Sequence, residues 1–290
     1  MHAIGRDLIE SMFRKAGVEA PTGQYDVDVK RQLEHVDIVA EIGAEHLLVI
    51  EDKVHSAEHS NQLQIYARAI SALYPQRKRA FLFLKTGDQS SYSAVEADLW
   101  TTFLRHDLLA VLRRGAGCQN AIHVDFLAMI EAREAAVQRF RTTPVAAWGP
   151  GDPAYVGLYL QLQVLLGDGH WRYVPNPSGG FLGFWWHNDG IEGGEIYLQL
   201  EEDKLVVKIW VEDGERRGEL RGLWSRRVVV GIPGFSRPTR FGNGEYMTVA
   251  TGGDYRIPGS DGRLDLEATV SRLQTVAAAL ARLVAAPPAA

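Results

Sequence analysis

Three ionisable residues stand at the ends of two short apolar segments, where they could carry out chemistry together. Asp37 lies in the segment Val36–Val39, whereas Glu51 and Lys53 follow the segment Leu47–Ile50. A charge at such a position is costly to remove from water unless a partner compensates it. If the two segments form a hairpin with a symmetric turn, Asp37 lies opposite Glu51 on one face. Lys53, two residues further along, projects from that same face.

Two opposed carboxylates repel each other and destabilise a sheet. A divalent cation between them would turn this penalty into a binding site, because carboxylate oxygens are good ligands for Mg²⁺. Such an ion polarises a phosphate and lowers the pKa of a bound water, and Lys53 would orient that water or offset transition-state charge. The set therefore indicates phosphodiester hydrolysis with Mg²⁺, for which Mn²⁺ can substitute. The alternative is a surface hairpin in which Lys53 simply pairs with Glu51 or Asp37.

Three further side chains could join this site. Gln62 and Tyr66 are four residues apart, so they share one face of a helix. A strand that feeds directly into this helix would bring that face beside the strand end that carries Glu51. Glu10, in the first expected helix, could supply another carboxylate.

The order Asp37, then Glu51-Asp52-Lys53, then Gln62-x-x-x-Tyr66 resembles the PD-(D/E)XK nuclease superfamily, in the branch with a QxxxY motif. The resemblance covers roughly residues 1–115. It implies a restriction-endonuclease-like core and Mg²⁺-dependent cleavage of DNA or RNA. The implied metal ligands are Asp37, Glu51 and Glu10, the implied catalytic lysine is Lys53, and the implied substrate-binding residues are Gln62 and Tyr66.

Two departures from the superfamily pattern concern residues beside the motif. Related sequences often read Gly-Arg-Ile-Asp where this chain reads Glu34-His35-Val36-Asp37, so a helper arginine is missing. Asp52 stands where many members have Asn or an aliphatic residue. Neither change removes a core catalytic residue.

The sequence thus predicts a metal-dependent nuclease that acts on nucleic acid, with DNA favoured over RNA, and, by family analogy, a role in bacterial defence. The alternative is a catalytically inactive nuclease-like module that binds nucleic acid or a partner protein. An intact pair of opposed carboxylates favours the enzyme, because loss of activity would remove the reason to keep them.

Composition limits the class of protein. Hydrophobic residues make up 46% of the 290 and charged residues 23%, which excludes wholesale disorder. The apolar runs are far shorter than the roughly 20 residues of a membrane span, and the first residues do not read as a signal peptide. The single Cys118 permits no internal disulfide, so we expect a cytoplasmic protein. With a net charge of −5, contact with a polyanion needs a local patch or a bound cation.

A change in composition near residue 145 predicts two domains. Residues 1–145 hold seven glycines and one tryptophan, whereas the rest hold 22 and six. The segment 143–153 contains three prolines and two glycines, which cannot continue a helix. We therefore expect a nuclease-like domain over 1–145 and a Trp- and Gly-rich α+β domain over 150–290.

Hydrophobic periodicity predicts the elements of both parts. The first part reads as a mixed central sheet flanked by helices, with a strand, helix and strand in succession after the hairpin turn. The second reads as an antiparallel sheet closed by a helix. Besides the hairpin, expected helices are 4–16, 60–73, 104–114, 124–140 and 267–285, and expected strands are 80–84, 195–200, 204–211, 227–232 and 246–251.

The largest aromatic concentration lies in the second part, at Trp185-Trp186 with Phe181, Phe184, Trp171 and Tyr173. Such rings stack on unpaired bases, or they fill the core of a small domain. This part could grip substrate, form a homodimer or bind a partner protein, and the sequence leaves these uses open.

Overall fold

The chain, described by a computed structural model, divides into two compact units, Met1–Ala135 and Ala136–Ala290. The structure describes residues 2–54, 56, 61–97, 99–176 and 179–286. The division falls inside α5 (Ala121–Thr142), some residues before the position that composition indicated. The helix ends only at Thr142, because Pro144 follows it and cannot continue it.

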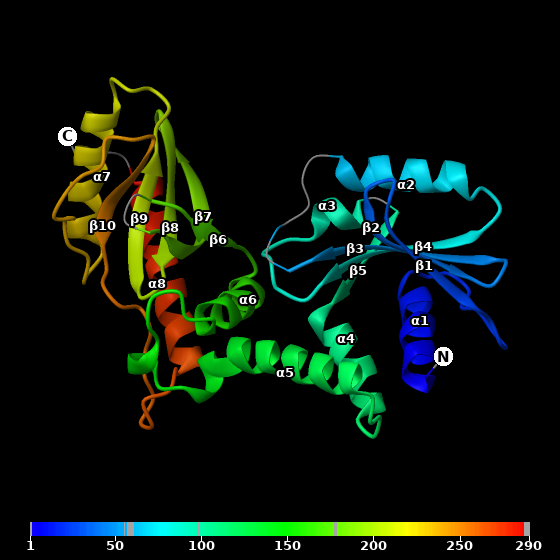
Figure 1. The fold of residues 1–290 in the computed structure, drawn as a ribbon. Coiled ribbons are helices and arrows are strands. Elements are labelled where there is room, and N and C mark those ends of the chain that lie inside the picture. Colours follow the sequence, from blue (N-terminus) through cyan, green and yellow to red (C-terminus); the bar gives the residue numbers. More distant parts are fainter. Residues whose placement is uncertain (1, 55, 57–60, 98, 177–178, 287–290) are drawn as a thin grey trace. The chain divides into compact units, whose positions relative to one another are not determined.

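The first unit contains a five-stranded mixed sheet (Figure 1). β1, β2 and β3 pair in antiparallel fashion, whereas β3, β4 and β5 pair in parallel. The predicted mixed sheet, flanked by helices, is thereby confirmed. The strands, in their order across the sheet, are β1 (Val27–Leu33), β2 (Val36–Ile42), β3 (His46–Lys53), β4 (Lys78–Lys85) and β5 (Trp100–Leu104).

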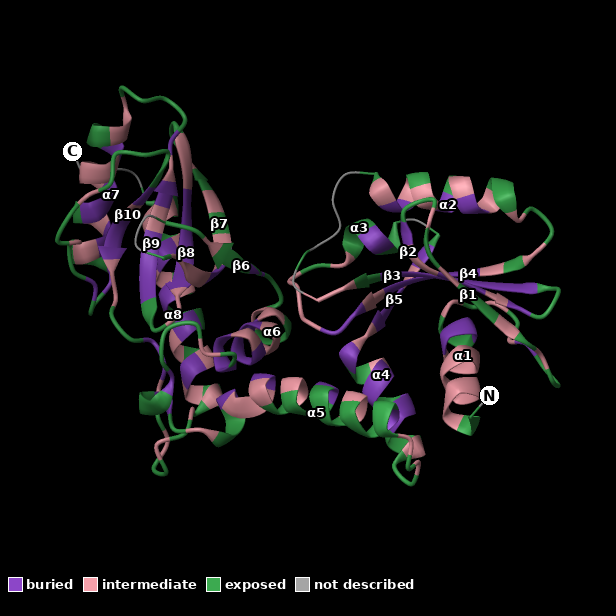
Figure 2. Cartoon of the chain, in the orientation of Figure 1, coloured by how far each residue is buried: buried purple, intermediate pink, exposed green. Residues whose placement is uncertain are grey.

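Helices cover both faces of this sheet. On one face, α1 (Ala3–Lys15) and α4 (Arg105–Leu112) share a core with Leu48 and Leu82. On the other, α2 (Gln62–Leu73) and the short α3 (Ser93–Glu96) share a core with Val49 and Phe83. Burial on both faces explains why β3 and β4 read as continuous apolar runs. Figure 2 shows these central strands largely buried.

The hairpin has the register that a symmetric turn predicts. Ile38 pairs with Ile50 and Val39 with Val49. α2 then connects β3 to the parallel strand β4, as expected for a strand, helix and strand. The helix is described from Gln62 onward, and Ser60, where we expected it to begin, lies outside the described residues.

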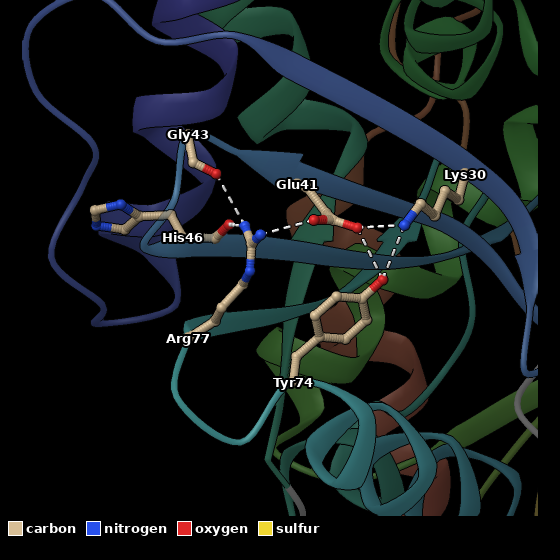
Figure 3. Close-up of polar contacts among 6 residues, drawn as sticks. All are labelled: Lys30, Glu41, Gly43, His46, Tyr74 and Arg77. Atoms are coloured by element: carbon tan, nitrogen blue, oxygen red, sulfur yellow. Dashed lines mark hydrogen bonds and ion pairs between the residues drawn. The ribbon is translucent and has the colours of Figure 1, made fainter.

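A polar cluster fixes the turn end of this hairpin (Figure 3). Glu41 of β2 accepts hydrogen bonds from Lys30 of β1, from the Tyr74 hydroxyl at 2.9 Å and from Arg77 Nη2 at 2.7 Å. Arg77 Nη1 also donates to the carbonyl oxygens of Gly43 and His46, at 3.0 and 3.2 Å. The cluster therefore ties β1, both strands of the hairpin and the end of α2 together.

The second unit contains a five-stranded sheet in which every pairing is antiparallel, as predicted. α6, α7 and α8 pack on one face of it and form the largest core of the chain's described residues. The elements are α6 (Ala154–Leu166), β6 (His170–Val174), β7 (Phe181–Ile191), β8 (Gly194–Glu201), β9 (Lys204–Trp210), α7 (Arg217–Gly231), β10 (Tyr246–Thr251) and α8 (Leu266–Ala285).

The strand predicted over 227–232 is wrong. Most of this segment is the end of α7, which begins at Arg217. Leu220, Trp224 and Val228 are buried four residues apart and form the inner face of that helix. The apolar run at its end resembles a strand only when these earlier positions are left out. Within the residues that the structure describes, no helix is both long and apolar enough to cross a membrane.

We expect Glu41→Gln to lower the free energy of unfolding by about 1–3 kcal/mol at neutral pH, because Lys30 and Arg77 would face each other uncompensated. The hydrogen bond from Lys30, followed by that from Tyr74 and the charges of Lys30 and Arg77, lowers the pKa of Glu41 below its usual 4.5 despite burial. Its contribution is therefore complete above pH 4.5 and is lost as the pH falls through the lowered value.

Urea denaturation between pH 3 and pH 8 measures this difference. The matched control is Glu45→Gln, whose exposed carboxylate lies 3.8 Å from Lys78 and should change stability by less than about 0.5 kcal/mol. Equal effects of the two substitutions at neutral pH would contradict the role given to Glu41.

Candidate functional site

Asp37, Glu51 and Lys53 come together at one end of the hairpin, opposite to its turn. Glu51 and Lys53 lie at the carboxyl end of β3, and Asp37 lies one residue before the last β2–β3 pair. The Asp52 backbone N–H donates to Asp37 Oδ2 at 2.9 Å, and Gln32 Nε2 of β1 donates to Oδ1 at 3.0 Å. Asp37 is thus held from both neighbouring strands.

Glu51 is 1% exposed, an unusual position for a carboxylate. Its Oε1 accepts hydrogen bonds from the Lys53 ammonium and, at 3.3 Å, from Gln62 Nε2. Its Oε2 is buried and has no hydrogen-bond partner among the described residues. The Lys53 ammonium lies 4.0 Å from Asp37 Oδ2, so it stands close to both carboxylates.

The electrostatics of this group favour an additional cation. Burial raises the pKa of Glu51 and the negative charge of Asp37 raises it further, while the bond to Lys53, the charge of Lys53 and the backbone of Asp37 only partly oppose the shift. Burial would lower the pKa of Lys53, but its hydrogen bond to Glu51 and the charges of Glu51 and Asp37 raise it overall. One ammonium therefore compensates two carboxylates incompletely.

The QxxxY face of α2 lies beside the carboxylates, as the spacing predicts. Gln62 Nε2 donates to the Tyr66 hydroxyl at 2.7 Å as well as to Glu51.

The ends of β3 and β4 pack closely together beside the site. A Cβ on Gly87, after β4, would lie 2.1 Å from the Val54 carbonyl oxygen, after β3. Only glycine permits that approach.

The structure does not bring Glu10 to this group. Glu10 lies on α1, which packs on the sheet face opposite to the one that carries Val49. Its carboxylate pairs with Arg14 at 3.5 Å, and its charge contributes to the raised pKa of Tyr25. Tyr25 lies near the turn of the hairpin, since its Cβ would be 3.6 Å from a Cβ on Gly43. An acidic residue in the first helix is a weak signal, since helical periodicity does not say which sheet edge it approaches.

Sequence reasoning missed two residues near the site. Gln32 bonds Asp37 from β1, a strand that we did not predict. Lys85 is fully buried at the end of β4, pairs in register with Lys53, and donates from Nζ to the Ser56 carbonyl oxygen at 2.6 Å. Burial, with the nearby charge of Lys53, lowers its pKa. A charged residue that ends an apolar strand, as Lys53 does on β3, was the available signal for Lys85.

The turn that precedes Asp37 is strained. Glu34 and His35 form a two-residue connection between β1 and β2 with φ angles of 48° and 69°, and Gln32 has a φ of 55°. Such turns normally use Asn or Gly, because side chains with a Cβ disfavour positive φ. Strain of this kind persists where the surrounding structure imposes it, and it collects at functional sites.

The residues present suit a divalent cation in part. Among the described residues no three His, Cys, Asp or Glu side chains form a ready metal-binding group, and the site offers two carboxylates. The buried, unpartnered Oε2 of Glu51 is an oxygen donor of the kind that Mg²⁺ prefers. Asp37 and Glu51 are therefore the residues that would hold such an ion.

The chain matches no protein-family model, no curated protein and no solved structure. The resemblance to the PD-(D/E)XK superfamily thus stays a prediction that depends on the motif residues themselves.

We expect Glu51→Gln to be at least as stable as the wild type in EDTA at neutral pH. The raised pKa means that ionised Glu51 destabilises the fold, an effect that is absent below its usual pKa of 4.5 and grows as the pH rises through the raised value. Addition of Mg²⁺ should raise the unfolding midpoint of the wild type and not that of the variant.

Thermal unfolding in EDTA and in Mg²⁺, followed by circular dichroism between pH 5 and pH 8, measures both effects. Glu45→Gln, far from the site at the hairpin turn, should keep the Mg²⁺ response of the wild type. An equal Mg²⁺ response of Glu51→Gln and the wild type would place the ion elsewhere.

Proposed function

We propose that the first unit is a Mg²⁺-dependent nuclease that hydrolyses phosphodiester bonds, with DNA as the substrate. The buried Glu51 carboxylate, with one unpartnered oxygen beside Asp37 and Lys53, is the observation that carries the proposal. Maintaining this desolvated acid lowers the stability of the protein, and binding of a divalent cation would compensate it.

The position of the group also supports this function. Ligands of open sheets with parallel strands commonly bind at the carboxyl ends of those strands, and Glu51, Lys53 and Lys85 lie at such ends. The hairpin, α2 and β4 follow one another as the resemblance to a restriction-endonuclease-like core implies.

Each residue has a role that its contacts suggest. Asp37 and Glu51 would hold Mg²⁺, which supplies a Lewis acid that stabilises charge on the phosphate and promotes ionisation of water. Lys53 would exchange its bond to Glu51 for the phosphate and offset the charge that develops there. Gln62 and Tyr66 share one hydrogen bond and would orient the backbone of the nucleic acid.

A second candidate is a catalytically inactive module that binds nucleic acid or a partner protein. The existing bond between Lys53 and Glu51 favours it, because that bond satisfies the ammonium within the protein. This candidate predicts salt-dependent binding with no cleavage.

Incubation of the protein with single- and double-stranded DNA and RNA, in Mg²⁺, Mn²⁺ or EDTA, tests the proposal. We expect cleavage with either ion, none in EDTA, and a loss of about 100-fold or more in Lys53→Ala and in Glu51→Gln, because each removes a charge that acts on the reacting phosphate.

The matched control is Lys15→Ala, which removes a surface pair with Asp107 on the opposite side of the sheet and should cleave as the wild type does. Cleavage that persists unchanged in Lys53→Ala would reject the assignment, and binding without cleavage in every metal would favour the inactive module.

A further inference from the structure

The sheet of the second unit has two unlike faces. One packs Phe184, Leu198 and Val207 into the core beneath α6, α7 and α8. The other, which these helices do not cover, is hollowed by a cavity of about 490 Å³. That volume lies in the range of about 300–1,000 Å³ typical of ligand sites.

Aromatic side chains from four adjacent strands line this cavity. Trp185 comes from β7, Tyr197 from β8, Trp210 from β9 and Tyr246 from β10. Tyr246 and Trp210 are direct cross-strand partners, and Gln199 is the partner of Trp185. Burial does not explain Tyr246, which is 62% exposed, and none of the four rings belongs to the core cluster beneath the helices.

Polar groups stand between the rings. Gln199 is 5% exposed and donates from Nε2 to Glu201 at 3.1 Å. Lys208, the partner of Tyr197, lies 3.7 Å from Glu201, and Glu195 accepts a hydrogen bond from Asn188. The cavity thus combines flat apolar surfaces with hydrogen-bonding groups at their edges.

Arg172 adds a positive charge that no acid in the described part of the chain pairs with. Its guanidinium Cζ lies 5.4 Å from the centroid of the Trp185 ring. A guanidinium that lies beside a ring at this distance keeps its N–H donors in one plane, which matches the geometry of a phosphate. An uncompensated cation beside a ring is notable in a chain of net charge −5.

We infer that this face of β6–β10 binds single-stranded nucleic acid, with unpaired bases stacked on Trp185 and Trp210 and a phosphate held by Arg172. Bases offer flat faces to the rings and polar edges to Gln199. An uncharged sugar could also stack on the rings, but it carries no anion for Arg172. This inference goes beyond the proposed nuclease function, since it assigns a second site and does not require cleavage.

The spacing of the rings indicates a short stretch of strand as the ligand. Trp185 and Trp210 lie on strands that β8 separates. Neighbouring strands are about 4.8 Å apart, so these two positions are at least about 10 Å apart across the sheet. One base cannot contact both rings, whereas consecutive nucleotides can. In a duplex the paired bases are stacked on each other, so their faces cannot reach the rings.

Fluorescence anisotropy of the full chain in EDTA, with labelled oligothymidylate and oligouridylate as probes, tests the inference. We expect Trp185→Leu to weaken binding by about 5- to 150-fold, the loss of one stacked base, and Trp185→Phe to retain most of it. Arg172→Gln should reduce the slope of log affinity against log salt by about 0.7, the value for one phosphate contact in a single strand.

The control variants remove side chains of the same kinds, one ring and one arginine, from positions outside this face. Tyr173→Leu removes an exposed ring next in sequence to Arg172 that alternates to the other side of β6, and Arg226→Gln removes an exposed arginine of α7. Both should bind as the wild type does. Circular dichroism verifies that each variant is folded, and if Trp185→Leu is not, Trp210→Leu measures the loss of one stacked base in its place.

In the Lys53→Ala background, Trp185→Leu should weaken binding of the probes by the same factor as in the wild type, which would support two separate sites. Failure of cleavage in every metal with tight binding of the probe would reject only the nuclease. Equal affinity for a duplex, wild-type binding by Trp185→Leu, or binding of an uncharged oligosaccharide in place of both oligonucleotides would overturn the inference.

Discussion

The removal of the Glu51 carboxylate from water is the constraint on which the candidate site depends. A carboxylate that is 1% exposed, with a second carboxylate nearby and one ammonium between them, is held in place by the rest of the fold. β3 supplies this rigidity, since it is central in the sheet and covered on both faces. The instability is local, and it lies where a cation or a phosphate could relieve it.

The carboxylates at the two ends of the hairpin differ in how far neighbouring cations compensate them. At the turn end, two cations and a hydroxyl surround Glu41 and lower its pKa. At the other end, two carboxylates share one lysine and the pKa of Glu51 is raised. The cluster around Glu41 fixes the register that brings Asp37 close to Glu51. The compensated charges at the turn end therefore hold the two repelling carboxylates together at the other end.

Sequence reasoning succeeded where local geometry determines the answer. The register of Ile38 with Ile50 follows from a symmetric turn, and the QxxxY face follows from helical spacing. It failed where distant parts of the chain decide. Whether Glu10 reaches the site depends on how α1 packs, and the role of Gln32 depends on β1, whose turn lacks the usual Asn or Gly. The segment 227–232 was misassigned because an apolar run fits a strand and a buried helix equally well.

The contact between Gly87 and Val54 has a consequence for how this chain can change. The backbone after β3 and the backbone after β4 lie so close that a side chain at position 87 cannot be accommodated. The backbones of the two strand ends therefore keep a fixed separation, and this includes the paired positions Lys53 and Lys85. The spacing of the two strand ends therefore tolerates substitutions elsewhere in the chain as long as residue 87 has no side chain.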